Sequence, residues 1–212
     1  MDSENRSALY RDQAASVEAR VEDLLSRMTL EEKIQQLNAI WVYEVLDEGS
    51  LDEQEATERL GLGIGQITRI GGASHLGPVQ SARMANQIQA YLRDHTRLGI
   101  PALVHEEACS GYMAKDATCF PQTIGIASSF DVDLVHDMAQ VVRDQMRAVG
   151  AHQALAPLLD VTRDPRWGPH RRNVWRRPLF GGADGHALCP RAAKRGRPSN
   201  GHGHRQALRG IR

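Results

Sequence analysis

The chain changes composition sharply at Pro169, and this change limits how much of it can fold as one domain. Residues 1–168 contain 15 basic and 25 acidic side chains, whereas residues 169–212 contain 11 lysines and arginines and one acid, Asp184. Hydrophobic periodicity ends at the same point, because the last segment matches neither a helical nor a strand repeat. We therefore expect a partial domain over residues 1–168 and a disordered, basic, low-complexity tail over residues 169–212.

Within residues 1–168, amphipathic helical segments alternate with short apolar strands. Helices are predicted at 16–28, from Thr29 of TLEEK onward, at 81–95, and from Asp131 to Gly150. Strands are predicted within GLGIGQITRIGG, IPALVHEE and HQALAPLLDVT. Apolar strands separated by helices are typical of parallel βα units covered on both faces. The pattern predicts an α/β fold, either a barrel or a doubly wound sheet.

Finer expectations follow from the same patterns. Ile34 and Leu37 continue the apolar face of the helix that Thr29 caps, so we expect both side chains to be buried. The acidic stretch 44–58 is expected to be solvated and rich in loops. The GLGIG segment lacks the third glycine and the following helix of a dinucleotide-binding fingerprint, so we interpret it as a tight turn.

Several classes of protein are disfavoured by composition. No apolar run approaches the ~20 residues that span a bilayer. The polar, acidic N-terminus does not resemble a secretory signal. Cys109, Cys119 and Cys189 are too few and too widely spaced for a disulfide framework or a zinc site. We expect a cytoplasmic protein with reduced thiols, without a metal, a cofactor or a membrane partner.

The segment VHEEACSG, residues 104–111, contains the first candidate site. His105, Glu106 and Glu107 follow an apolar strand, at the carboxyl edge where ligands bind in barrels and open α/β sheets. A carboxylate at this edge is able to accept hydroxyl protons from a sugar, to bind a metal or to move a proton. The alternative interpretation is a solvated loop after a strand.

The segment APLLDVTRDPRWG, residues 156–168, has the same organisation. An apolar strand is followed by Asp160, Arg163 and Asp164, and then by Trp167. The guanidinium of Arg163 offers a fixed fork of donors to ligand hydroxyls, and Asp160 or Asp164 would orient it. A structural network of arginine and aspartate under a loop is the alternative.

Three segments in order resemble the start of glycoside hydrolase family 3: RVEDLLSRMTLEEKIQQL, GIPALVHEEACSGYMAKDATCFPQTIGIASSFD and LAPLLDVTRDPRWG. The resemblance covers roughly residues 17–168, and the family includes β-glucosidases and β-xylosidases. It implies the first part of a (β/α)8 TIM-like barrel. It also implies exo-acting, retaining hydrolysis at the non-reducing end by two carboxylates about 5 Å apart.

The resemblance further implies roles for individual residues. Glu107 matches an acidic residue that binds hydroxyls of the non-reducing sugar, and Arg163 matches an arginine of the same subsite. Glu106, Asp164 and Trp167 would support them. No cofactor or metal is implied, and the expected partner is an oligosaccharide or another glycoside.

After RDPRWG the chain departs from the family pattern. The family continues with a stretch like RTEETFGEDP, then a Lys-His-Phe motif, an aspartate nucleophile and an acid/base, all missing here. One codon choice for residues 167–178 gives Trp-Gly-Arg-Thr-Glu-Glu-Thr-Phe-Gly-Glu-Asp-Pro once a single G after the Trp167 codon is deleted. We hypothesise that residues 169–212 are an out-of-frame translation. The chain would then be a truncated fragment without catalytic residues, inactive alone.

The alternative function is a non-catalytic protein that binds carbohydrate, or nucleic acid through the basic tail. The cations of the tail would neutralise phosphates with a steep salt dependence. However, the tail contains no recognisable nucleic-acid-binding fold, so this partner is disfavoured. The sequence leaves open which sugar and linkage are bound, and the oligomeric state.

Overall fold

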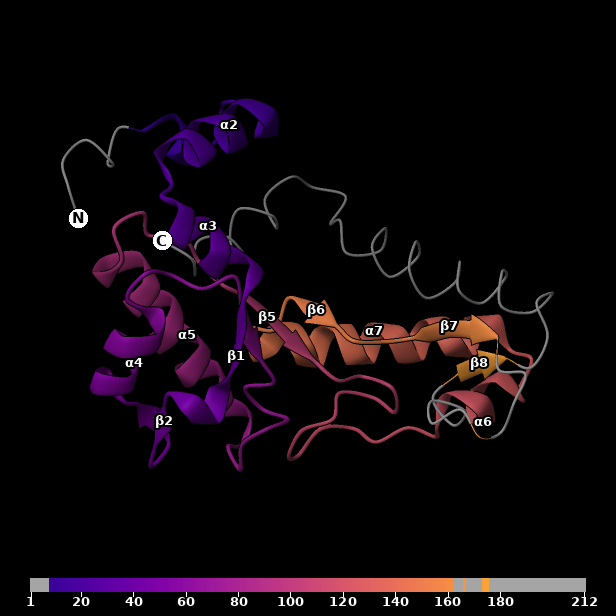
Figure 1. The fold of residues 1–212 in the computed structure, drawn as a ribbon. Coiled ribbons are helices and arrows are strands. Elements are labelled where there is room, and N and C mark those ends of the chain that lie inside the picture. Colours follow the sequence, from indigo (N-terminus) through magenta and orange to yellow (C-terminus); the bar gives the residue numbers. More distant parts are fainter. Residues whose placement is uncertain (1–7, 162–165, 167–172, 176–212) are drawn as a thin grey trace. The chain divides into compact units, whose positions relative to one another are not determined.

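The computed structural model describes residues 8–161, 166 and 173–175, and the chain divides into two compact units, Met1–His105 and Glu106–Arg212 (Figure 1). The helices are η1 (Leu9–Arg11), α2 (Val17–Arg27), α3 (Leu30–Leu37), η2 (Val42–Glu44), α4 (Glu53–Leu60), α5 (Pro78–His95), α6 (Thr123–Ala127) and α7 (Val132–Ala148). The strands are β1 (Ala39–Trp41), β2 (Leu46–Asp47), β3 (Ser50–Leu51), β4 (Gln66–Thr68), β5 (Leu103–Glu106), β6 (Gln153–Ala154), β7 (Leu158–Val161) and β8 (Asn173–Trp175).

A parallel sheet forms the centre of the first unit. β1 pairs with β4 and β4 pairs with β5, both in parallel, so that Ile40, Ile67 and Val104 lie in register. The order β1-β4-β5 follows the order along the chain, and each pair of neighbours is linked by a segment that contains a helix. This is the arrangement of consecutive βα units. The prediction of an α/β fold with a parallel sheet is confirmed.

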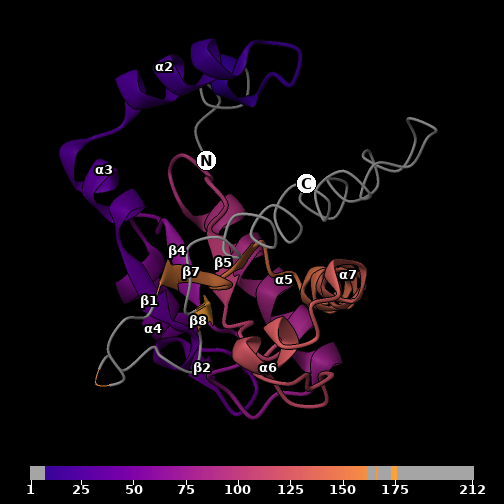
Figure 2. The same cartoon turned by 90° about the vertical axis from the view of Figure 1, so that its right-hand side faces the viewer.

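The two faces of this sheet differ in chemistry. Ile67 and Val104 are fully buried on one face. Because side chains alternate along a strand, Gln66, Thr68 and His105 lie on the opposite face. The helix α5 lies beside the sheet in both views (Figures 1 and 2) and buries the apolar stripe Met84, Ile88 and Leu92. The helix predicted at 81–95 is confirmed, and it begins earlier because Pro78 suits its first position.

The glycines of GLGIG form a turn and a close backbone contact, as the sequence predicts. The N–H of Gly63 donates to the carbonyl of Leu60 at 2.7 Å, and Gly63 has a φ of 85°. Gly65 donates to the Gln35 carbonyl and accepts from the Leu103 N–H, both at 2.9 Å. This segment therefore joins the end of α3 to the start of β5 and lacks the geometry of a phosphate-binding loop.

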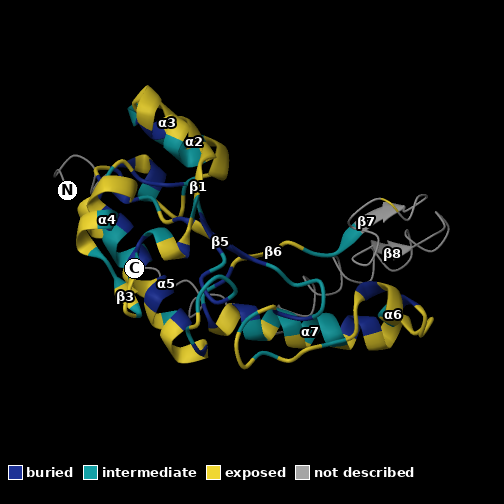
Figure 3. Cartoon of the chain, turned by 60° about the horizontal axis from the view of Figure 1, so that its bottom comes forward, coloured by how far each residue is buried: buried dark blue, intermediate teal, exposed yellow. Residues whose placement is uncertain are grey.

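The expected burial of Ile34 and Leu37 is wrong. Their side chains are 50% and 86% exposed, and Figure 3 shows largely exposed surfaces on α2 and α3. The helix itself forms as predicted, with a capping box between Thr29 and Glu32. Periodicity identifies an apolar face, but it does not establish that another element covers that face. The buried side chain of α3 is instead Glu32.

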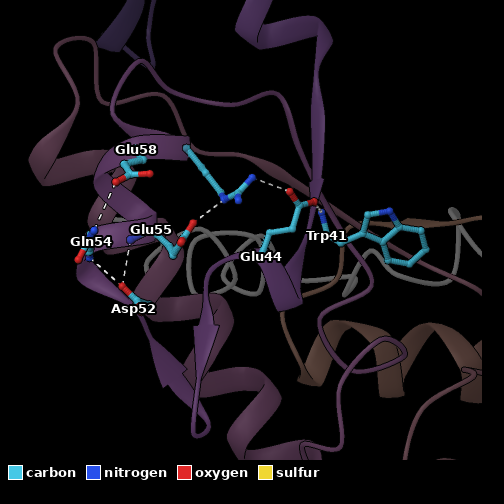
Figure 4. Close-up of polar contacts among 7 residues, drawn as sticks. Trp41, Glu44, Asp52, Gln54, Glu55 and Glu58 are labelled. Atoms are coloured by element: carbon cyan, nitrogen blue, oxygen red, sulfur yellow. Dashed lines mark hydrogen bonds and ion pairs between the residues drawn. The ribbon is translucent and has the colours of Figure 1, made fainter.

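The acidic stretch 44–58 is also more ordered than the sequence predicts. It contains the β2–β3 hairpin and most of α4. Asp52 caps α4, because its Oδ1 accepts from the N–H groups of Gln54 and Glu55 at 2.8 and 3.0 Å (Figure 4). Ala56 and Leu60 are fully buried. This short helix was not predicted, because charged residues surround its two buried residues in the sequence.

The second unit contains the helix predicted after Asp131. The Asp131 side chain accepts from the N–H of Leu134 at 2.9 Å, and Gly150 follows the helix with a φ of 83°. The predicted strand HQALAPLLDVT forms two strands, β6 and β7, on either side of Pro157, which has no N–H to donate. β7 pairs in parallel with β8, which falls within the segment predicted to lack regular structure. Residues 176–212 of that segment lie outside the described residues.

The ion pair of Glu32 with Arg97 gives a test of stability in the first unit. Arg97 Nε donates to Glu32 Oε1 at 2.9 Å and Nη2 binds Oε2, while Thr29 N–H also donates to Oε2 at 2.9 Å. The hydrogen bonds from Arg97 hold the pKa of Glu32 below its ordinary value, against the opposing effect of burial.

Glu32→Gln is expected to lower the free energy of unfolding by about 1–2 kcal/mol at neutral pH. Because the pKa of Glu32 is lowered in the folded state, its contribution is full above the unfolded-state pKa and is lost as the pH falls through the folded-state pKa. We expect the difference in the free energy of unfolding between the wild type and Glu32→Gln to shrink as the pH falls from 6 to 3. Urea unfolding at each pH measures it. If this difference stays constant over the pH range, the stabilisation by Glu32 does not come from its ion pair with Arg97.

Candidate functional site

The end of β5 carries two acidic residues, Glu106 and Glu107, with different surroundings. Glu106 is almost fully buried, and Tyr112 Oη donates to its Oε1 at 3.4 Å. Its backbone carbonyl accepts from the N–H of Leu155 at 2.8 Å, next to β6. Glu106 therefore ties the strand end to the chain that follows it.

Glu107 is the more accessible carboxylate. It is half-buried, and the Sγ of Cys109 lies 3.8 Å both from its Oε2 and from the carbonyl oxygen of Leu155, so the thiol proton has two alternative acceptors. A thiol is a weak donor, so the carboxylate retains acceptor capacity for stronger donors such as sugar hydroxyls. The backbone carbonyl of Glu107 accepts from the N–H of Met113 at 3.0 Å, which fixes the start of the loop after β5.

The loop after Glu107 is closed by a glycine. Gly111 has a φ of 90°, and a Cβ at this position would lie 2.3 Å from the carbonyl oxygen of Thr118 and 3.0 Å from the Phe120 ring. The N–H of Phe120 donates to the carbonyl of Ser110 at 2.9 Å across the same turn. Both the close approach and the left-handed conformation require glycine. The loop that presents Glu107 is therefore built around Gly111.

Gly111→Ala is expected to open this loop. The substitution combines left-handed strain with a clash against backbone, so we expect a loss of about 2–4 kcal/mol of stability. Hydrogen exchange should show new exchange in residues 107–122 before the rest of the chain. Gly125→Ala is the control, since its Cβ would lie at an ordinary 3.5 Å from Pro121 Cβ. Unchanged protection in the loop of the Gly111→Ala protein would contradict the role of this glycine.

His105 lies on the opposite face of β5 from Glu106. Its Nδ1 is 2.8 Å from Gln66 Oε1, an acceptor, so this contact favours a proton on Nδ1. Its backbone carbonyl accepts from the N–H of Arg69 at 2.9 Å. The strand ends of β4 and β5 are therefore joined just beyond their last register pair, Thr68 and His105.

Arg69 is a candidate residue that the sequence patterns did not identify. It has a φ of 56°, in the left-handed region, and its Nη2 donates to the carbonyl of Gly72 at 3.1 Å. The Nε is buried and has no hydrogen-bond partner among the residues that the structure describes. Strained backbone and unpaired buried donors are concentrated at binding sites. A charged residue in a glycine-rich turn gave no periodic signal by which to find it.

The second candidate segment is largely outside the described residues. Arg163, Asp164 and Trp167 all fall there, so their predicted positions beside Glu107 stay predictions. Among the described residues, no group of three or more His, Cys, Asp or Glu side chains is placed to hold a metal ion. In the same part of the chain, none of the helices combines the length and apolar character needed to cross a membrane.

Residues 29–176 match the family model of the glycosyl hydrolase family 3 N terminal domain. The chain belongs to glycoside hydrolase family 3, a family of glycosidases. A putative beta-xylosidase from Formosa agariphila is 35% identical over 163 residues, which cover 75% of this chain and 21% of the relative. Beta-glucosidase C from Emericella nidulans is 36% identical over 171 residues, covering 75% of this chain and 27% of its own length.

Solved structures of the family have the same fold. A β-glucosidase from Erythrobacter marinus superposes with a TM-score of 0.75 at 29% identity, over 86% of this chain and 24% of its own. A beta-glucosidase from Listeria innocua in complex with isofagomine gives a TM-score of 0.60 at 30% identity, over 82% of this chain and 22% of its own. The chain thus spans about a quarter of the length of these family 3 proteins.

Proposed function

We propose that this chain carries the first part of a family 3 (β/α)8 barrel, with a sugar-binding pocket at the carboxyl edge of its parallel sheet. The sugar would be the terminal unit of a β-glucoside or β-xyloside. The main support is the position of Glu107, a half-buried carboxylate with one weak thiol donor directly after a central strand. Ligands of barrels bind at this edge.

In this proposal Glu107 accepts two hydroxyl protons of the pyranose, and Arg163 donates to neighbouring hydroxyls. Charge-assisted hydrogen bonds of this kind are stronger than neutral ones and fix the orientation of the ring. Glu106 supports the strand end through Tyr112, while Asp164 would orient Arg163 and Trp167 would pack beneath the site. The polar face that carries Gln66, Thr68 and His105 would face the interior of the barrel.

The chemistry proposed for the complete enzyme is retaining hydrolysis with a carboxylate nucleophile and a carboxylic acid/base. We propose that neither is encoded in the 212 residues, and that residues 169–212 are translated in the wrong reading frame. The change to a basic composition after Gly168 supports this. The fragment would then bind a sugar but would not cleave a glycoside. The nucleic-acid alternative depends on the cations of residues 169–212, all of which lie outside the described residues, and no observation favours it.

Titration of the chain with glucose and xylose tests the proposed pocket. We expect binding in the millimolar range and a loss of at least about tenfold in affinity for Glu107→Gln, which replaces a charged acceptor. Glu55→Gln is the matched control, because Glu55 makes a surface ion pair with Arg59 on α4. Equal affinities in the two variants would show that Glu107 does not bind the sugar.

A further inference from the structure

Two cysteines, Cys109 and Cys119, lie in the loop that Gly111 closes. Cys109 is half-buried, Cys119 is exposed, and both side chains are thiols in the structure. The sequence spacing argues against a framework of several disulfides, but it leaves open a single bridge within one loop. Only nine residues separate the two cysteines, so joining them closes a short ring at a small cost in chain entropy.

The contacts of this loop place the two cysteines on opposed chain segments. The N–H of Phe120 donates to the carbonyl of Ser110 at 2.9 Å, so the chain returns on itself between these residues. Cys109 directly precedes Ser110, and Cys119 directly precedes Phe120. Because side chains alternate along an extended chain, we expect both cysteines to leave these segments on the same face. They are then diagonal neighbours across the loop.

A bridge between these positions requires a small movement of the loop. Diagonal neighbours on opposed segments have Cα atoms about 7–8 Å apart, whereas a disulfide spans Cα atoms about 4.4–6.8 Å apart. The Sγ of Cys109 now lies 3.8 Å from Glu107 Oε2 and from the Leu155 carbonyl oxygen, and the Sγ of Cys119 lies 3.7 Å from the Phe120 carbonyl oxygen. Thiol hydrogen bonds are weak, so both thiols are able to rotate toward each other.

We propose that Cys109 and Cys119 form a redox-dependent disulfide that controls the loop beside Glu107. The oxidant is a small-molecule disulfide, such as oxidised glutathione. The thiolate of the exposed Cys119 attacks it and releases one glutathione, and the thiolate of Cys109 then attacks the Cys119 sulfur and releases the second. Two protein thiols are oxidised, one disulfide is reduced to two thiols, and the two protein protons pass to the two glutathione thiolates.

The bridge has two consequences for the loop. It prevents the segments that carry Ser110 and Phe120 from separating, so it slows local opening. It also withdraws the Cys109 sulfur from the Glu107 carboxylate and draws the chain that follows Glu107 toward Cys119. We expect sugar binding to weaken as a result. Only this last consequence rests on the proposed function, because the disulfide forms whether or not Glu107 binds a sugar.

Oxidation of the 212-residue chain carrying Cys189→Ser tests the bridge, because this variant retains only the two cysteines of the loop. Oxidised glutathione should yield a protein that has lost two hydrogens by mass, with one peptide linking Cys109 to Cys119. Dithiothreitol should reverse this. The matched control adds Cys119→Ser and should form no intramolecular bridge. Recovery of the two-cysteine protein as thiols, or with glutathione still attached and no bridge, would overturn the disulfide.

Hydrogen exchange and glucose titration of the oxidised and reduced forms test the control of the loop. Exchange of the Phe120 amide should be slower in the oxidised form, and glucose should bind at least about fivefold more weakly. The Cys119→Ser control should give equal values under both conditions. Bridged protein with unchanged exchange would overturn the control of the loop, and unchanged affinity would overturn its effect on Glu107. Absence of glucose binding in both forms would overturn the proposed function, and the exchange of the Phe120 amide would then decide the switch.

Discussion

Purified 212-residue chain is expected to leave nitrophenyl β-glucoside and nitrophenyl β-xyloside unhydrolysed above the buffer rate. Retaining hydrolysis requires a nucleophile and an acid/base on either side of the scissile bond. At the described strand end, Glu106 is almost fully buried and accepts from Tyr112 Oη, so it is not exposed to serve as one of two carboxylates flanking a glycosidic bond. Loss of a central catalytic group costs as much as about 10⁶-fold in kcat in enzymes where it has been measured.

Deletion of one G after the Trp167 codon should produce a protein that hydrolyses nitrophenyl glycosides. This expectation requires that the gene continues in the reading frame that encodes the family sequence. The expected gain is at least about 10⁴-fold over the 212-residue chain, measured as nitrophenol release at saturating substrate. The restored protein with Glu107→Gln is the control, since it keeps the catalytic carboxylates and lacks the proposed sugar acceptor. Two results would contradict this interpretation. One is glycoside turnover by the 212-residue chain itself, and the other is a gene that no single-base change returns to the reading frame of the family.

The sequence predicted those parts of the fold that depend on local periodicity and on burial from both sides. The stripe Met84, Ile88 and Leu92 of α5 is fully buried, as its spacing predicts. Ile67 and Val104 are buried in adjacent parallel strands, and Glu107 follows the second strand as expected. In these elements, the local sequence preference and the tertiary environment favour the same structure. The hydrophobic pattern alone was therefore sufficient to predict which side chains are buried.

Features that depend on contacts between distant residues could not be predicted from hydrophobic periodicity. The helix α3 has an apolar face, but Ile34 and Leu37 remain exposed because burial depends on what packs against them. The left-handed backbone of Arg69 is held by a hydrogen bond from its N–H to the carbonyl of His105, which is 36 residues away in sequence. The stacking of Trp41 on Tyr43 likewise requires the turn of η2.

Gly65→Ala is expected to destabilise the first unit by at least about 3 kcal/mol, because a Cβ here would collide with the backbone of Gln36. It would lie 2.0 Å from the carbonyl oxygen of Gln36 and 2.6 Å from its carbonyl carbon. Relief requires β4 to move away from the end of α3. That movement would break the 2.9 Å hydrogen bonds of Gly65 with Gln35 and with Leu103.

The measurement is the urea midpoint of unfolding followed by circular dichroism, and Gly125→Ala provides a chemically identical change as control. At Gly125, in α6, the nearest atom is Pro121 Cβ at 3.5 Å, so alanine should be neutral or stabilising by about 0.4–1 kcal/mol. A Gly65→Ala midpoint equal to that of the wild type would mean that β4 tolerates displacement. The ends of β1 and β4 would then not be held in fixed positions by the sheet, and a preformed carboxyl edge of the first unit would lose its physical basis.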